Sequence, residues 1–192
     1  MAFRYLFVLL IAANTAQAND IDLANAARAQ IGITKLYDAK YSKLKYPNGD
    51  VSISSGVCTD VVIRALRTAH KMDLQQLVHE DMSKYFSLYP KNWGLKNTDK
   101  NIDHRRVPNL QVFFKRHWQN ILISNDRANY EAGDIVTVML PKNLPHIMLV
   151  SNIKDSTSHI PLVIHNIGNG TQEENRLFSF QITGHYRLPN NQ

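Results

Sequence analysis

The stretch SSGVCTDVVIRALR, residues 54–67, contains the only cysteine of the 192-residue chain and indicates how that residue is presented. Two serines and a glycine are typical of a turn with a helix cap, and the residues that follow have helical periodicity. The stretch therefore predicts a turn that leads into an amphipathic helix over residues 57–71, with Cys58 in its first turn. The predicted apolar face of this helix consists of Val61, Val62, Ala65, Leu66 and Ala69.

Cys58 has no partner for an intrachain disulfide, so the fold must be held by its core and the thiol needs another explanation. The unpaired N–H groups and the positive dipole end of a helix N-terminus stabilise a thiolate, which favours a nucleophilic role. Asp60, two residues later, suits the helix dipole but opposes ionisation of the thiol, so a cationic partner is required. Free cysteine is also among the most buried residue types, and an inert core cysteine is the alternative.

The N-terminus has the features of a secretory signal peptide. Arg4 precedes an apolar run over residues 6–13, and the predicted leader of residues 1–18 ends in the small-residue motif AQA, so we expect cleavage after Ala18. The run is shorter than the about 20 apolar residues that span a bilayer, and no later segment reaches that length. We expect a periplasmic or secreted protein without a transmembrane segment, whose residues 19–192 form one domain.

Charge and spacing narrow the choice of partner. The formal net charge is +6, and loss of Arg4, the only charged residue of the leader, lowers it to +5. A modestly basic exported protein suits an anionic partner such as a cell-wall polymer, whereas scattered basic residues argue against nucleic acid. No H-x-x-x-H or C-x-x-C spacing occurs, so we expect no metal and no other cofactor. A zinc site formed by Cys58, His146 and His165 is the weaker alternative.

The order of the predicted elements favours an α+β domain. Helical periodicity dominates the first half of the chain, and β-branched runs separated by turn-forming residues follow residue 130. The predicted helices cover residues 20–34, 57–71, 73–86 and 110–118. The predicted strands cover residues 133–140, 146–153 and 161–167, with one or two more within 177–188. We therefore expect N-terminal helices packed on a mostly antiparallel C-terminal sheet or half-barrel.

Two of the eight histidines, His146 and His165, occupy the most informative positions. His146 opens a predicted strand directly after the turn PKNLP, which would hold its imidazole at the rim of the sheet. His165 ends the next strand, so the two could meet across a hairpin, where His165 could fix the tautomer of His146. Asn166 could do the same, but neighbours on a strand face opposite ways, so only one of them can point at His146. The alternative is two ordinary strand ends, satisfied by backbone or water.

The segment NIDHRRVPNL, residues 101–110, is a dense polar cluster in an otherwise irregular region. Its candidate residues are Asp103, His104, Arg105 and Arg106. A guanidinium group binds a carboxylate through two parallel hydrogen bonds, so one of the arginines could hold a carboxylate of a substrate. The alternative is an internal network, from Asp103 to an arginine, that pins the loop to the body of the protein.

The order of these motifs resembles that of the NlpC-type cell-wall peptidases of the papain-like superfamily. In that family a cysteine begins a helix, a Gly-Asp strand follows, and then come a strand that opens with histidine and a strand that ends in histidine. The matching segments here are GVCTDVV with Cys58, AGDIVTVM from Ala132, PHIMLVSN with His146 and LVIHN with His165. The chain also resembles the exported YijF-like bacterial family, through the segments YPNGDV, GVCTDVVIRALR, NIDHRRVPNL, HNIGNG and GHYRL.

By matching position, the resemblance implies that Cys58 is the nucleophile, His146 the base and later the acid, and His165 the orienting group. It implies a papain-like fold and an exported cysteine hydrolase that cleaves an amide in peptidoglycan stem peptides, with a muropeptide as substrate. Tyr46 precedes the cysteine much as a tyrosine does in the family, and its hydroxyl could lie near the oxyanion. The family's C-S-G at the nucleophile is C-T-D here, so the pocket beside the thiol differs.

The remaining candidates for contact with substrate or oxyanion are Tyr46, Asp60, Asp103, His104, Arg105, Arg106 and Asn166. Of these, Arg105 or Arg106 could bind a carboxylate of the stem peptide. Two alternatives stay open. The same triad could act on another acyl substrate, an ester, a lipid or a protein amide, or the chain could be a non-catalytic cell-wall-binding module in which Cys58 is a core residue.

Overall fold

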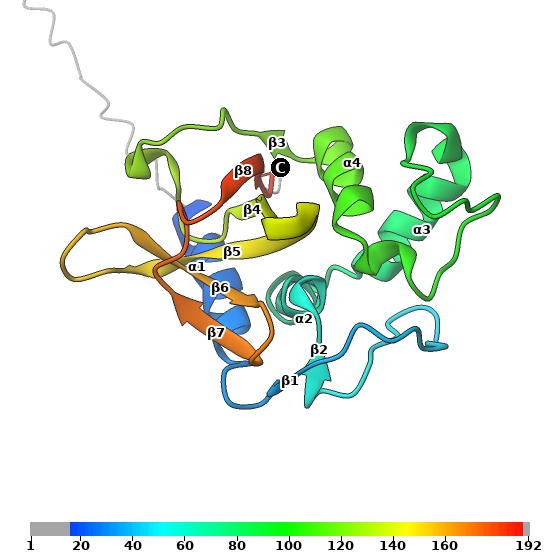
Figure 1. The fold of residues 1–192 in the computed structure, drawn as a ribbon, viewed down its shortest axis with the longest axis horizontal. Helices are drawn as coiled ribbons and strands as arrows, with labels where there is room; N and C mark the ends of the chain where they lie inside the picture. The colour runs from blue at the N-terminus through cyan, green and yellow to red at the C-terminus, as the bar shows by residue number, and fades with distance from the viewer. Residues whose placement is uncertain (1–15, 190–192) are drawn as a thin grey trace, which may run out of the picture.

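The computed structural model describes residues 16–189, which contain four α-helices and a six-stranded sheet (Figure 1). The α-helices are α1 (Ala16–Arg28), α2 (Cys58–His70), α3 (Leu74–Tyr85) and α4 (Val107–His117). Short 3-10 helices are η1 (Phe86–Leu88), η2 (Asp103–Arg105), η3 (Arg127–Asn129) and η4 (Pro141–Asn143). The strands are β1 (Leu36–Tyr37), β2 (Ser55–Gly56), β3 (Gln119–Asn120), β4 (Ile135–Leu140), β5 (Leu144–Lys154), β6 (Pro161–Asn166), β7 (Thr171–Glu174) and β8 (Gln181–Arg187). Most of the predicted signal peptide, residues 1–15, lies outside the described residues.

The large sheet is antiparallel throughout and has the strand order β3-β8-β4-β5-β6-β7. β4 and β5 form a continuous hairpin, whereas the pairing of β5 with β6 starts only at Leu149, opposite Ile164. The first residues of β5 therefore leave the side that faces β6 open. Separately, β1 and β2 form a short parallel pair that brings Tyr37 beside Gly56, two residues before Cys58.

The two faces of the sheet bury different clusters. α1, α2 and α4 contact the strands directly, while α3 packs outside them against α2 and α4. In Figure 1, α1 lies behind the sheet, and α2, seen nearly end-on, lies beside the sheet and below α4. The strand residues packed with the helices are Ile135, Ile147, Leu149, Ile164 and Tyr186. The opposite face buries Val136, Val138, Met148, Val150 and Val163 against Tyr130 and Leu177.

Helix α2 is buried around its whole circumference in its first half, because every residue from 58 to 66 is buried. The predicted apolar face is confirmed: Val61, Val62, Ala65 and Leu66 lie in the main core, and Ala69 packs at its edge. The polar side of the helix, which carries Asp60 and Arg64, is covered as well, by the loop before Cys58 and by η2. α2 is therefore a central helix, and its buried charges need partners.

The predicted α+β class, with helices first and an antiparallel sheet afterwards, is confirmed. The segment 177–188 contains one strand, β8, rather than two. β7 was not predicted, because its sequence TQEE has no β-branched run. Within the part of the chain that the structure describes, no helix has the length and apolar character needed to cross a membrane.

Candidate active site

Cys58 is the first residue of α2, as the sequence predicts, but the helix is capped differently. The N-cap residue is Val57, in extended conformation, and not one of the preceding serines. The Asp60 carboxylate instead turns back and accepts a 2.7 Å hydrogen bond from the Val57 backbone N–H. This satisfies one of the free donors at the helix start and places a negative charge near the helix N-terminus, where the dipole stabilises it.

Asp60 is held in turn by Arg105 of η2. Nε and Nη2 of Arg105 each lie 2.9 Å from a different carboxylate oxygen of Asp60. Burial opposes the charge on the guanidinium, but the hydrogen bonds and charge of Asp60 raise the pKa of Arg105. The ion pair therefore ties η2 to the start of α2, and these two candidate substrate contacts satisfy each other.

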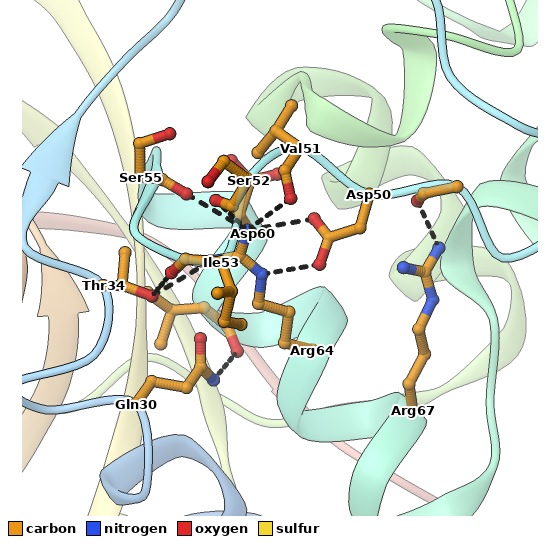
Figure 2. A network of polar contacts seen from close by, with 12 residues as sticks. Gln30, Thr34, Asp50, Val51, Ser52, Ile53, Ser55, Asp60, Arg64 and Arg67 are labelled. Atoms are coloured by element: carbon orange, nitrogen blue, oxygen red, sulfur yellow. Dashed lines mark hydrogen bonds and ion pairs between the residues drawn. The ribbon is translucent and has the colours of Figure 1, made fainter.

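The loop that leads to Cys58 is held by arginines of α2 itself, as Figure 2 shows. Arg64 binds both carboxylate oxygens of Asp50, at 2.8 and 3.0 Å. Its guanidinium also donates to Thr34 Oγ1 and to the backbone carbonyls of Val51, Ser52 and Ser55. Arg67 donates to the carbonyl of Gly49 at 2.9 Å and pairs with Asp73. The backbone of residues 49–55 is thus fixed from the helix that it precedes.

Asn166 closes the same region from the sheet. Its Nδ2 donates to the carbonyl of Gly56 at 3.0 Å and to that of Leu36 at 3.3 Å. The side chain is fully buried, so these contacts occupy it. Asn166 therefore anchors the β1–β2 pair beside Cys58, and it is not the residue that contacts His146.

The sulfur of Cys58 lies against the open start of β5. The backbone N–H groups of Ile147, the residue after His146, of Thr59 and of Cys58 itself interact with the sulfur and favour its ionised form. Only 5% of the residue is exposed. Burial raises the pKa of the thiol to about 11, the nearby Asp60 adds to the rise, and the three N–H groups oppose it. The thiol is therefore protonated at neutral pH.

His146 and His165 meet as the sequence predicts. His146 Nε2 and His165 Nδ1 are 2.8 Å apart, and the rings meet edge to face. On its other side, His165 Nε2 lies 3.0 Å from Glu174 Oε2. Burial, reinforced by His165, lowers the pKa of His146 to about 3, and burial also lowers that of His165. Both rings are therefore neutral at pH 7, and within residues 16–189 no hydrogen bond engages His146 Nδ1.

A cavity of about 210 Å³ reaches the thiol. Its lining residues are Tyr37, Ala39, Val57, Cys58, Trp93, Ile102, Arg105, Arg106, Val107, Pro108 and Pro145. Most of the wall is apolar, and the guanidinium of Arg106 is stacked 4.2 Å over the Trp93 ring. Two guanidinium groups line the cavity. Arg105 is held by Asp60, so Arg106 is the one left to contact a bound ligand. Arg106 makes one 3.3 Å contact with Asp103, and its side chain is 17% exposed.

Of the candidate residues, Cys58, Arg105 and Arg106 line this cavity, whereas His146 and His165 do not, although Pro145 beside His146 does. Tyr46, Asp103 and His104 have other surroundings. The Tyr46 ring packs edge to face on His79, and Tyr37 rather than Tyr46 lies near the thiol, where burial followed by the Cys58 charge raises the pKa of Tyr37. Asp103 accepts the backbone N–H of Asp99, and burial raises its pKa. Burial, with Arg67 and Arg105, lowers the pKa of His104 to about 3. Asp103 and His104 are buried, and neither lines the cavity.

Sequence reasoning missed Tyr37, Trp93 and Glu174. Tyr37 stands in a two-residue strand and Trp93 in an irregular segment, where periodicity carries no signal. Glu174 follows a turn in a strand without β-propensity. It also missed the buried Asp134, whose carboxylate binds His185 at 2.7 Å and Arg187 at 2.7 and 2.9 Å across β4 and β8.

The described residues contain no group of three or more His, Cys, Asp and Glu side chains arranged to hold a metal ion. The fold and the site define the class of the protein: an α+β domain whose central helix begins with a cysteine, beside a strand that carries one of two hydrogen-bonded histidines. Residues 24–188 match the family described as "Domain of unknown function (DUF1287)". The chain belongs to this family.

Two further likenesses are specific. The chain is 53% identical over 182 residues to the "Uncharacterized protein YijF" of Escherichia coli (strain K12), covering 94% of this chain and 85% of that protein. The predicted membership of a YijF-like family is therefore confirmed. The structure of NlpC1 from Trichomonas vaginalis is similar with a TM-score of 0.49 and 13% identity, over 93% of this chain and 47% of that one. The chain thus spans about half the length of that structure.

Proposed function

We propose that this protein is a cysteine hydrolase, in which Cys58 attacks a carbonyl carbon, His146 transfers the proton and His165 holds the imidazole. The observation that carries the proposal is the convergence at the start of β5. The backbone N–H of Ile147, the residue after His146, interacts with the thiol sulfur, and the ring of His146 is hydrogen-bonded to His165 at 2.8 Å. A nucleophile, a base and a group that orients the base are the parts that covalent hydrolysis requires.

The raised pKa of the Cys58 thiol and the lowered pKa of His146 indicate how the proton moves. Because the thiol and the imidazole are both neutral, His146 Nδ1 takes the proton of Cys58 as the sulfur attacks the carbonyl carbon. N–H groups at the start of α2 stabilise the negative oxygen that forms. His146 then protonates the leaving amine, and the acyl group remains on the sulfur. Water, deprotonated by His146, attacks the thioester and releases the acid and the free thiol.

For the substrate we propose an amide in a peptidoglycan stem peptide, as the motif resemblance implies. The apolar cavity supports an acyl group with little charge near the thiol, and Arg106 at its wall supports recognition of a carboxylate. Asp60 and Arg105 support the thiol's position rather than a substrate contact, because each occupies the other. The predicted leader adds export to the proposal, and the mature protein recovered from bacteria should then begin at Asn19, as intact-mass measurement would show.

Digestion of muropeptides of known composition tests the proposal. Wild type should release products that mass spectrometry identifies, whereas Cys58→Ala and His146→Ala should release none. The variant His159→Asn, which changes an exposed histidine, serves as a control that should keep full activity. Equal product release by wild type and Cys58→Ala would contradict the proposal. Activity on an ester or a protein amide but not on muropeptides would keep the triad and replace the substrate.

The burial of the thiol favours a second candidate, a non-catalytic cell-wall-binding domain in which Cys58 is a core residue. Cys58 belongs to the main apolar cluster as well as to the cavity wall. Under this alternative, folded protein should co-sediment with sacculi, release no products from them, and bind equally well after Cys58→Ala. Wild type and Cys58→Ala, compared in both assays, therefore distinguish catalysis from binding.

A further inference from the structure

Glu174 is the outer end of a chain of hydrogen bonds that reaches the proposed base. Its Oε2 lies 3.0 Å from His165 Nε2, and His165 Nδ1 lies 2.8 Å from His146 Nε2. We propose that Glu174 is a positioning residue that sets the tautomers of both histidines, so that His146 Nδ1 carries a lone pair. The catalytic consequence of this inference rests on the proposed function, whereas the hydrogen-bond geometry does not depend on it.

The direction of each hydrogen bond follows from the carboxylate. An ionised carboxylate only accepts, so His165 Nε2 must carry the proton of the bond to Glu174. A neutral imidazole has a single N–H, which makes His165 Nδ1 an acceptor and His146 Nε2 the donor of the 2.8 Å bond. His146 Nδ1 is then unprotonated and can accept the thiol proton. The burial that lowers the pKa of His165 favours its neutral form, although Glu174 acts in the opposite direction.

Strand pairing explains why Glu174 reaches His165. His165 stands opposite Gln172 and Val163 opposite Glu174, so Glu174 is the diagonal neighbour of His165 on the same face of the sheet. Glu173 points to the other face, where it binds Arg28 of α1 and Ser151 of β5. The two adjacent glutamates therefore have separate partners, and Glu173 provides a matched control.

Charge adds a second effect during catalysis. When His146 takes the thiol proton, the positive charge lies one histidine away from Glu174, which stabilises it. Glu174 is 31% exposed and has Arg176 4.0 Å away, so solvent and that cation weaken the effect. Glu174 should therefore act mainly through the tautomers and less through its charge.

The tautomers can be read directly from the ¹⁵N signals of the histidine rings in folded protein, without a substrate. Wild type and Glu173→Leu should both show His146 and His165 protonated on Nε2. In Glu174→Leu, His165 Nε2 loses its acceptor, and a new population with His146 protonated on Nδ1 should appear. In Glu174→Lys the ammonium can only donate, so this inverted population should dominate. Ring signals identical to wild type in both Glu174 variants would overturn the inference.

Hydrolysis provides the second readout. Where wild type cleaves muropeptides, Glu174→Leu should lower kcat/KM by about 10- to 100-fold, less than the about 10⁴-fold loss when a directly bonded orienting carboxylate is replaced. Glu173→Leu should change it by less than about threefold. Unchanged kcat/KM in Glu174→Leu would also overturn the inference. If wild type proves inactive, the proposed function fails while the ring signals still test the tautomers, so the two failures are distinguishable.

Discussion

Arg105 and Asp60 form a two-pronged ion pair, with both guanidinium-to-carboxylate contacts at 2.9 Å and side chains that are 2% and 3% exposed. The pair joins residues 45 positions apart and fixes the first turn of α2, which presents Cys58. Charges this deeply buried are tolerated because each compensates the other and because Asp60 also accepts the Val57 N–H. The start of the central helix therefore depends on a residue from η2.

Replacing Arg105 should be far more damaging than replacing its neighbour. Arg105→Leu leaves the Asp60 charge buried without its cation, so we expect the free energy of unfolding to fall by about 3–5 kcal/mol. Arg106→Leu removes a 3.3 Å contact with Asp103 and the stacking on Trp93 from a partly exposed side chain, and should cost about 1–2 kcal/mol. Urea denaturation of the two variants measures both values.

The substitutions Arg105→Leu and Arg106→Leu also distinguish a structural role from substrate recognition. Arg106→Leu should raise the KM for a substrate with a carboxylate near the scissile bond while the protein stays folded. Similar destabilisation by the two substitutions would show that the Arg105–Asp60 pair contributes no more to stability than the contacts of Arg106. A KM unchanged in Arg106→Leu would remove the proposed carboxylate contact.

The sequence predicted what local patterns encode and missed what long-range pairing decides. The helix around Cys58 and the strands that carry His146 and His165 have clear periodicity, and the β5–β6 hairpin brings the two rings together as expected. The partner of Arg105 was not readable, because Asp60 is distant in sequence and looks like a helix-start residue. Glu174 was not readable either, because its contact depends on the register of β6 against β7.

The thiol of folded protein should react slowly at neutral pH. Because its pKa is raised to about 11, alkylation by iodoacetamide should accelerate about tenfold per pH unit between pH 7 and 10. Protein unfolded in urea should instead level off above about pH 8.5, the ordinary range for cysteine. A rate plateau between about pH 4 and 8 in the folded protein would indicate a thiolate–imidazolium pair and would contradict the neutral pair.

The raised thiol pKa also predicts alkaline destabilisation. The folded state holds the thiol proton more tightly than the unfolded state, so this contribution is complete below about pH 8.5 and is lost as the pH rises towards 11. Cys58→Ala removes the group, and its stability should fall less than that of wild type between pH 8.5 and 10. Urea denaturation across this range compares the two. Parallel curves would mean that the thiol titrates normally in the folded protein.

Buried neutral histidines predict acid destabilisation. The pKa values of His104 and His146 are lowered to about 3, whereas unfolded histidine has a pKa near 6.5. Unfolding therefore takes up protons, and the free energy of unfolding should fall by about 1.4 kcal/mol per pH unit for each of these histidines as pH drops from 6 to 4. His104→Gln should reduce this slope by about one such step, and His159→Asn, at an exposed site, should leave it unchanged. An equal slope in all three proteins would place His104 in contact with water.

Loss of the Asp134 carboxylate, next to β4, should strongly destabilise the fold. Fully buried, it accepts from His185 at 2.7 Å, from Arg187 at 2.7 and 2.9 Å, and from the Glu131 N–H at 2.9 Å. Its lowered pKa reflects Arg187 and then His185, against the effect of burial. Asp134→Ala strips all four contacts and should lower the free energy of unfolding by about 3–5 kcal/mol, whereas Glu131→Gln, at an exposed ion pair with Arg187, should cost at most about 1 kcal/mol. Urea denaturation at pH 7 compares them, and equal losses would mean that the Asp134 network contributes no more to the fold than a surface ion pair.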